Sequence, residues 1–154
     1  MRYVAVQQDD FDVGAEVAQL RKSGSNAGAV CTFTGMVREF QQDAGTDRIS
    51  ELFLEHYPGM TEKSLREIVD QAFERWQLLS CRVIHRVGSL HPGDQIVFVG
   101  TVSEHRHDAF AAAEFIMDYL KTRAPFWKRQ TGTGGTEWVA HRESDEVAAD
   151  RWKP

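Results

Sequence analysis

Runs with the two-residue period of strands alternate along the chain with runs that have the period of helices. Alternating or short apolar runs predict strands at 2–7, 27–37, 49–57, 81–87 and 95–102, the last two joined by a hairpin loop at 91–94. Apolar residues recurring every three or four positions predict helices at 11–20, 61–76 and 108–124. A hairpin (126–130 and 137–140) and a last helix (143–152) follow. This mixture predicts an α+β fold, with residues 1–154 forming one domain.

Several of these elements have recognisable ends. Thr61 and Asp108 are predicted to cap their helices, because their side-chain oxygens can accept hydrogen bonds from the first free N–H groups. The polar stretch 38–48 predicts a mobile surface loop. The strand at 27–37 is expected to be buried, with Gly35 marking a bulge or a close approach of the backbone.

The composition narrows the class of protein. The 154 residues carry a net charge of −5, which argues against general binding to nucleic acid or to a membrane surface. No apolar run reaches membrane-spanning length, and the first residues lack the basic and then apolar pattern of a signal peptide. Cys31 and Cys81 match no metal or redox spacing and are predicted to be reduced, buried thiols. We therefore expect a cytoplasmic protein.

Positive charge is concentrated in one short segment of this acidic chain. Residues 121–129 contain no acid and four cations, which are Lys121, Arg123, Lys128 and Arg129. Pro125 ends the preceding helix, because the residue before a proline is pushed out of the helical region. Lys121 and Lys128 therefore cannot share one helical face, and they can meet only through a turn.

Two further cationic points follow predicted strands, Arg38 after 27–37 and His105-Arg106 after 95–102. If these groups converge with the segment 121–129, they form a pocket for an anion such as a phosphate. Ordinary roles are also open. Lys121 and Arg123 could complement a helix dipole, Lys128 and Arg129 could line an edge strand, and the other cations could pair with surface carboxylates.

Two other motifs compete with an anion site. The histidines allow a zinc site, formed by His105 and His107 with Asp108, His85 or His91. No other recognised metal spacing supports it, so no metal is expected. The Gly-rich run at 131–136 lacks the Gly-Lys-Ser/Thr ending of a phosphate loop, and it predicts a hairpin turn.

Several segments resemble the large, catalytic subunits of molybdopterin synthase. They are FTGMVR (33–38), LEHYPGM with TEKSLREIVDQA (54–72), VIHRVGSLHPGDQIVFVG (83–100), SEHRHDAF (103–110), FIMDYLKTRAPFWKR (115–129) and RESD (142–145). The match runs in the right order from about residue 27 to 152, and its DYLKTRAPFWK block is highly specific. The chain is therefore identified as a member of this family.

The resemblance implies an enzyme of molybdenum-cofactor biosynthesis. It would convert cyclic pyranopterin monophosphate (precursor Z) to molybdopterin by inserting two dithiolene sulfurs. The donor in this family is a small ubiquitin-like carrier whose C-terminal Gly-Gly ends in a thiocarboxylate. The implied assembly is a homodimer within a heterotetramer, and the implied fold is an α/β hammerhead with an additional small antiparallel β subdomain. Neither a metal nor another cofactor is expected.

The resemblance also assigns roles to residues. Lys121 and Lys128 match the family's two essential lysines and are the candidate catalytic residues. The cations Arg123, Arg129 and Arg106 are expected, with Lys121, to lower the pKa of Lys128. The candidate substrate-binding residues are Met36, Val37, Arg38, His105, Arg106, Lys121, Lys128, Arg129, Gln130 and Arg142. Two rival hypotheses are a non-catalytic binding module, for a phosphorylated small molecule or a partner's C-terminal tail, and a zinc hydrolase built on His105 and His107.

Overall fold

The computed structural model describes residues 1–40, 48–139 and 142–154. Their elements, in chain order, are β1 (Arg2–Gln7), α1 (Val13–Leu20), β2 (Ala29–Met36), β3 (Ile49–His56), α2 (Met60–Arg75), β4 (Leu78–Arg86), β5 (Gly88–Leu90), β6 (Gln95–Ser103), α3 (Arg106–Arg123), β7 (Phe126–Gly132), β8 (Gly135–Trp138) and α4 (Glu143–Asp150). Residues 41–47 of the predicted mobile loop lie outside the described residues.

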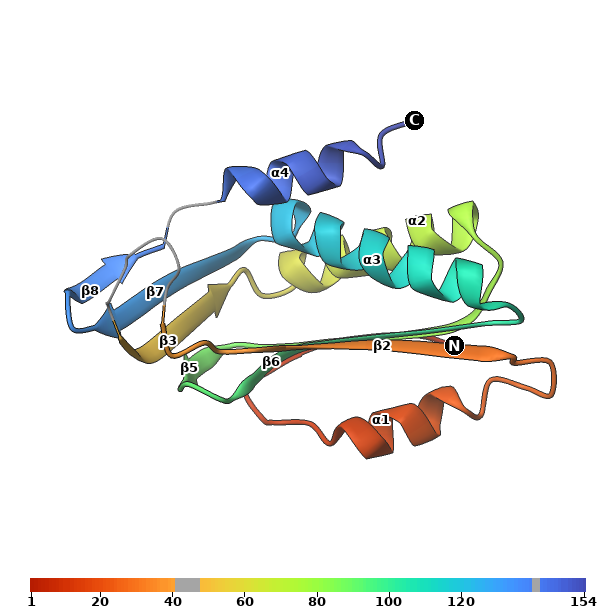
Figure 1. Cartoon of the computed structure of the whole chain (residues 1–154), viewed down its shortest axis with the longest axis horizontal. Helices are drawn as coiled ribbons and strands as arrows, with labels where there is room; N and C mark the ends of the chain where they lie inside the picture. The colour runs from red at the N-terminus through yellow and green to blue at the C-terminus, as the bar shows by residue number, and fades with distance from the viewer. Residues whose placement is uncertain (41–47, 140–141) are drawn as a thin grey trace.

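The first sheet has the strand order β1-β4-β6-β2 and is covered by helices on both faces. Strand β1 runs parallel to β4, and the other neighbours are antiparallel. Helices α2 and α3 lie over one face and α1 over the other (Figure 1). On the α2–α3 side, Val69 and Phe115 pack with Val83 and Val99, because alternate residues of β4 and β6 face that side.

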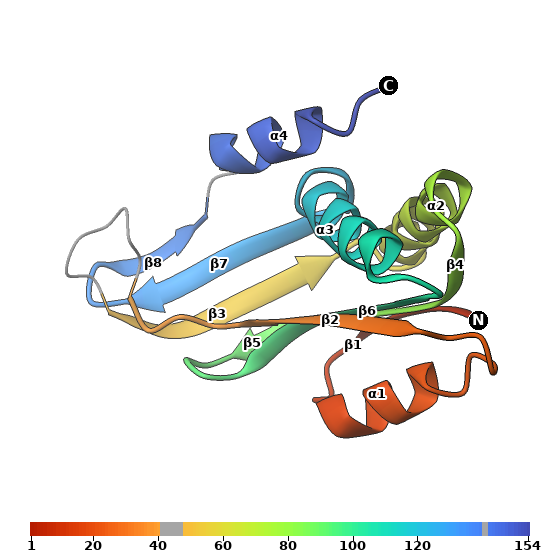
Figure 2. The same cartoon turned by 45° about the vertical axis from the view of Figure 1, so that its right-hand side comes forward.

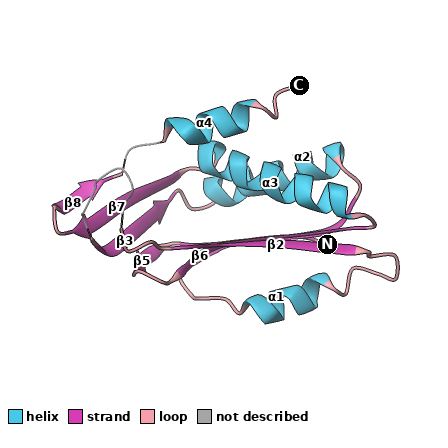
Figure 3. Cartoon of the chain, viewed as in Figure 1, coloured by secondary structure: helices cyan, strands magenta, loops and turns pink. Residues whose placement is uncertain are grey.

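The second sheet is antiparallel, has the order β5-β3-β7-β8, and extends from one end of the first sheet (Figure 2). A small core of Val37, Leu52, Leu54, Val87 and Leu90 joins the two sheets. Helix α4 lies against α3 on the side away from the first sheet (Figure 3). The predicted α+β fold with an additional small antiparallel sheet is therefore confirmed.

Strand β2 is an edge strand, so the prediction that it is buried is wrong. Its side chains Val30, Phe33 and Met36 are exposed by 42%, 44% and 57%. An apolar run cannot by itself distinguish a central strand from an edge strand with an uncovered side. The role predicted for Gly35 is confirmed, since the register shifts there and an added Cβ would lie 2.7 Å from Cγ1 of Val97.

Both predicted helix caps are wrong. Helix α2 begins at Met60 after Gly59, which has a φ of +84°, and the hydroxyl of Thr61 bonds elsewhere. Helix α3 begins at Arg106, two residues before the predicted range 108–124, and Asp108 in its first turn accepts a hydrogen bond from the N–H of Gln77. Short-range sequence could not show these distant partners.

Two further features of the chain bear on its class. Cys31 and Cys81 are both free, as predicted, although only Cys81 is fully buried. None of the helices in the described ranges has both the length and the apolar character needed to span a lipid bilayer.

Candidate active site

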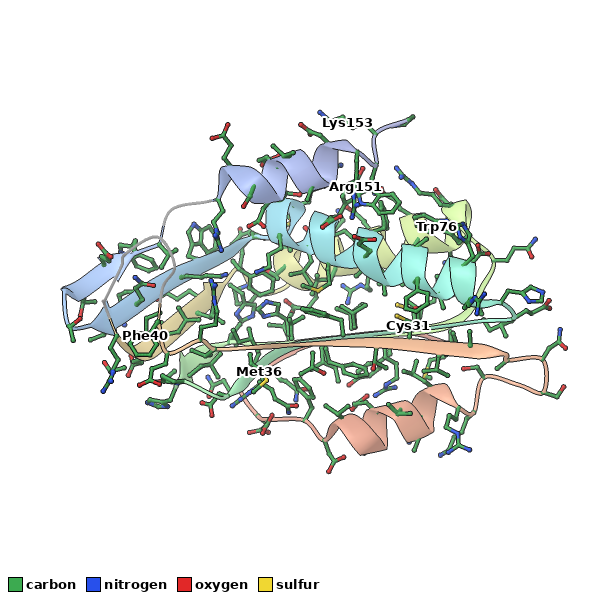
Figure 4. The ribbon with its side chains drawn as sticks, viewed as in Figure 1. Cys31, Met36, Phe40, Trp76, Arg151 and Lys153 are labelled. Atoms are coloured by element: carbon green, nitrogen blue, oxygen red, sulfur yellow. The ribbon has the colours of Figure 1, made fainter. Side chains whose placement is uncertain are left out.

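A pocket of about 450 Å³ lies where the end of β2 meets the second sheet. Its lining combines cations with apolar side chains, from Met36, Val37, Arg38, Ile49, Leu52, Ile96, Lys121, Lys128, Gln130, Glu137, Trp138, Val139 and Arg142. Figure 4 labels Met36 near this end of β2. Seven of the ten predicted site residues therefore lie in one place.

The register of β7 decides which of its side chains reach the pocket. Lys128 pairs with Leu54 and Gln130 with Leu52, and both leucines are buried between the sheets. Side chains alternate along a strand, so Arg129 points to the opposite face. There its guanidinium lies 4.8 Å from the ring centre of Phe53, and the structure does not bring it to the pocket.

The two lysines meet through a turn, as their sequence predicts. Lys121 lies in the last turn of α3, and Lys128 is the third residue of β7. Burial, followed by the positive charge of Lys121 and a side-chain hydrogen bond with it, lowers the pKa of Lys128 to about 8. A pKa near 8 makes the neutral form of the Lys128 amine more accessible near neutral pH than that of an ordinary lysine.

Helix α4 and the residue before it bring two opposite charges to Lys128. Asp145 raises the pKa of Lys128 and Arg142 lowers it, both by weaker effects than burial and Lys121. The expectation that Arg123, Arg129 and Arg106 would act on Lys128 is not met. Arg123, for example, stacks over the ring of Tyr119 at 3.9 Å.

The C-terminal residues hold α4 in this position. Nε1 of Trp152 donates to Asp118 at 2.7 Å, and Arg151 pairs with the same carboxylate at 2.9 Å. The C-terminal segment is thereby fixed to α3, the helix that also carries Lys121.

Arg38 reaches the pocket because the backbone before it is fixed. The N–H of Val37 donates to the carbonyl of Asp94 at 2.9 Å, and the N–H of Gly93 donates to the carbonyl of Val37 at 2.9 Å. The Asp94 carboxylate in turn accepts from the N–H of His91 at 2.8 Å, which closes the predicted hairpin loop. This tight loop sets the direction in which β2 leaves the first sheet, and with it the position of Arg38.

His105 and Arg106 lie away from this pocket, at the start of α3. Arg106 is the first residue of α3 and Lys121 lies fifteen residues along it, which is about 22 Å of helix. Arg106 lines a second pocket, of about 390 Å³, with His107, Phe110, Ala111, Glu114 and Trp152. Within one chain, Arg38 and the two lysines therefore line the same pocket, whereas Arg106 lies at the other end of α3.

The histidines do not gather into a metal site. No three His, Cys, Asp or Glu residues within the described ranges are placed to hold a metal ion. His85 is buried, and its Nδ1 lies 2.8 Å from the carbonyl oxygen of Arg86. That burial, together with the nearby charges of Lys128 and Lys121, lowers the pKa of His85 to about 3.

Sequence reasoning missed the remaining lining of the pocket. Leu52 and Ile49 come from β3, and Glu137, Trp138 and Val139 from β8 and the residue after it. The pairing of Leu52 with Gln130 on β7 would have found the first of them, had the register been known. Asp145 lies in the RESD segment that the family resemblance already included.

Comparison with known proteins extends over nearly the whole chain. The MoaE protein family matches residues 6–123. The molybdopterin synthase catalytic subunit of Vibrio cholerae is 57% identical over 150 residues, 97% of this chain and 97% of that protein. Its counterpart in Escherichia coli is 55% identical over 149 residues, again 97% of each. The structure of a molybdopterin biosynthesis MoaE protein from Burkholderia ambifaria has a TM-score of 0.83 at 48% identity, covering 99% of this chain and 98% of that one.

Proposed function

The chain belongs to the MoaE family, and we propose that its paired lysines perform the sulfur-transfer step that makes molybdopterin. The substrate is cyclic pyranopterin monophosphate. The two dithiolene sulfurs come from the C-terminal thiocarboxylate of a small ubiquitin-like carrier subunit. The observation that carries this proposal is the contact of Lys121 with Lys128 inside a pocket. A site that only binds anions does not need an amine whose pKa is lowered toward neutral pH.

Each lysine has a distinct task in this proposal. Lys128 is the acid/base group at the pterin side chain, because its neutral amine can take a proton from the side-chain carbon next to the one that bonds to the thiocarboxylate sulfur and return it to the hydroxyl that leaves as water. Lys121 carries the neighbouring positive charge. It stabilises the negative charge that develops on the carrier's terminal carbonyl oxygen when water attacks the acyl carbon, which breaks the carbon–sulfur bond, leaves the sulfur on the pterin and releases the carrier as a carboxylate.

Arg38 binds the substrate phosphate in this proposal, since a guanidinium offers two parallel donors to two phosphate oxygens. We expect Arg38→Glu to raise the dissociation constant of the substrate by about 100-fold or more, because a favourable charge becomes a repulsive one. Isothermal titration calorimetry with cyclic pyranopterin monophosphate measures this constant. Glu39→Arg, a reversal at the next residue, is the control for a change in net charge. An unchanged constant for Arg38→Glu would place the phosphate elsewhere.

A homodimer would bring Arg106 of one chain to the pocket of the other. Among the described strands β2 lies at the edge of the first sheet, and its exposed Val30 and Phe33 are suited to burial against another chain. Ala29 at its start pairs with Ser103, close to Arg106, and its end leads to the pocket. A second copy placed antiparallel along β2 would bring its own His105 and Arg106 to the pocket of the first.

This arrangement predicts complementation between two inactive variants. Arg106→Ala and Lys128→Ala chains are each expected to lose most activity alone. Chains that mix at random form mixed dimers with one intact site of two, so we expect about a quarter of wild-type activity to return. The assay is turnover after the two variants are unfolded and refolded together. Mixtures no more active than either variant would exclude a site shared between chains.

The proposed function is tested by reconstitution. The purified protein is mixed with thiocarboxylated carrier and cyclic pyranopterin monophosphate, and molybdopterin is measured as its fluorescent oxidation product. Carrier that ends in an ordinary carboxylate is the control, because it has no sulfur to transfer. Tight binding of carrier and substrate without product would support the binding-module hypothesis instead.

We further propose that the protein works in the cytoplasm, where its free thiols Cys31 and Cys81 stay reduced.

A further inference from the structure

The geometry of the lysine pair depends on the short turn between α3 and β7. Helix α3 ends at Arg123, and Ala124 after it is extended, with φ −90° and ψ 130°. The N–H of Phe126 donates to the carbonyl of Ala124 at 3.0 Å, and β7 begins there. The direction of Lys128 relative to Lys121 is therefore set at Ala124 and Pro125.

Thr61 holds this turn from the side of α2. Its side chain is fully buried, and its hydroxyl donates to the carbonyl of Pro125 at 2.9 Å. The same oxygen accepts from the N–H of Tyr57 at 2.9 Å, just beyond the end of β3. One hydroxyl thus connects the end of β3 with a turn that lies 64 residues after Thr61 in sequence. A buried hydroxyl with both a donor and an acceptor partner fixes the groups it joins.

His85 supports the turn from the first sheet. Its ring stacks on Phe126, with centroids 3.9 Å apart and planes inclined by 20°. A carbonyl oxygen only accepts hydrogen bonds, so Nδ1 of His85 carries the hydrogen that bonds to Arg86. The ring is neutral and adds no charge beside the lysines. Its flat face limits movement of Phe126, two residues before Lys128.

We propose that Thr61 is a positioning residue for catalysis, whose hydroxyl fixes the α3–β7 turn so that Lys128 stays beside Lys121 in the pocket. The expected effect of Thr61 on turnover rests on the proposed function. The contact itself can be measured without turnover. Thr61 is not among the residues that line the pocket, and its hydroxyl reaches the turn through the carbonyl of Pro125.

Loss of the Thr61 hydroxyl is expected to raise the pKa of Lys128. The charged groups that act on Lys128 are Lys121 from α3, Asp145 from α4 and Arg142 just before α4, while His85 faces it from β4 as a neutral ring. The turn governs the distance to Lys121 without bearing directly on α4. When Lys128 moves away from Lys121, the pKa of Lys128 rises toward the ordinary lysine value, because a nearby positive charge disfavours the protonated form.

Thr61→Val tests the proposal, because it keeps the shape of the side chain and removes the hydroxyl. The rate of acetylation of Lys128 by trace acetic anhydride is followed against pH by mass spectrometry, which reports the pKa of that amine. We expect the midpoint to rise by roughly half a unit or more, and kcat in the reconstituted reaction to fall by about tenfold. The dissociation constants for carrier and substrate are expected to stay unchanged. Thr61→Ser retains the hydroxyl and is expected to restore both the midpoint and kcat.

Thr101→Val is the matched control. Thr101 is equally buried, and its hydroxyl donates to the carbonyl of Ala109 at 2.7 Å, at the other end of α3. It loses a bond of the same kind and should leave the Lys128 midpoint in place. Thr61→Ala provides the same test if Thr61→Val does not fold. A wild-type midpoint in a folded variant without the Thr61 hydroxyl, or an equal shift in Thr101→Val, would overturn the proposal. A wild-type protein that makes no molybdopterin would refute the proposed function, and the acetylation profile would still decide the role of Thr61.

Discussion

Replacement of Lys128 by alanine is expected to lower turnover by roughly 10²–10⁴-fold, the range typical for loss of an acid/base group. The largely buried amine has its pKa lowered to about 8, so it is the group best suited to exchange a proton near neutral pH. Single-turnover assays with saturating thiocarboxylated carrier and substrate measure the effect. Titration calorimetry is expected to show that the variant still binds carrier, since the rest of the pocket is intact.

The pH dependence gives the same prediction a sign. A lysine is protonated below its pKa, so wild-type turnover is expected to rise with pH and to level off above about pH 8. Lys128→Arg should be inactive over this whole range, because a guanidinium does not give up its proton. Lys22→Ala, on an exposed lysine just after α1, is the control and should keep the wild-type profile. Wild-type turnover in Lys128→Ala would remove Lys128 from the mechanism.

The family resemblance named Lys121 and Lys128 as the centre of the candidate site, and the local sequence predicted that they could meet only through a turn. Pro125 between two lysines requires a turn, and the turn is where Lys121 and Lys128 meet. The separation of Arg106 from Lys121 was not predicted, because the helix was expected to begin at 108 and Arg106 to lie before it, whereas α3 carries both residues about 22 Å apart. The orientation of Arg129 was not predicted either, because it depends on the pairing of β7 with β3, more than 70 residues away in sequence.

The parts of the fold that escaped prediction depend on contacts distant in sequence. Thr61 is a residue type that often caps helices, yet its hydroxyl donates to the carbonyl of Pro125. The position of Asp145 depends on the anchoring of Trp152 to Asp118, 34 residues earlier. Strand β2 is apolar enough for a core but lies at an edge. Patterns along the chain identify elements and their periods, whereas these outcomes depend on which surfaces finally meet.

Helices α2, α3 and α4 meet at Phe115, and its replacement by alanine is expected to lower the free energy of unfolding by about 3–5 kcal/mol. The ring is fully buried and lies 5.3 Å from Trp76 and 5.7 Å from Trp152, measured between centroids. The cavity left behind would loosen the anchor of α4 as well as the α2–α3 contact. Urea unfolding followed by tryptophan fluorescence measures the loss. Phe110→Ala on the same helix is the control, because that ring is 65% exposed and its removal leaves no cavity. Equal stability losses in the two variants would mean that Phe115 does not anchor the helical layer, whereas a loss confined to Phe115→Ala would show that α4, and with it Asp145, is held at the pocket by the core.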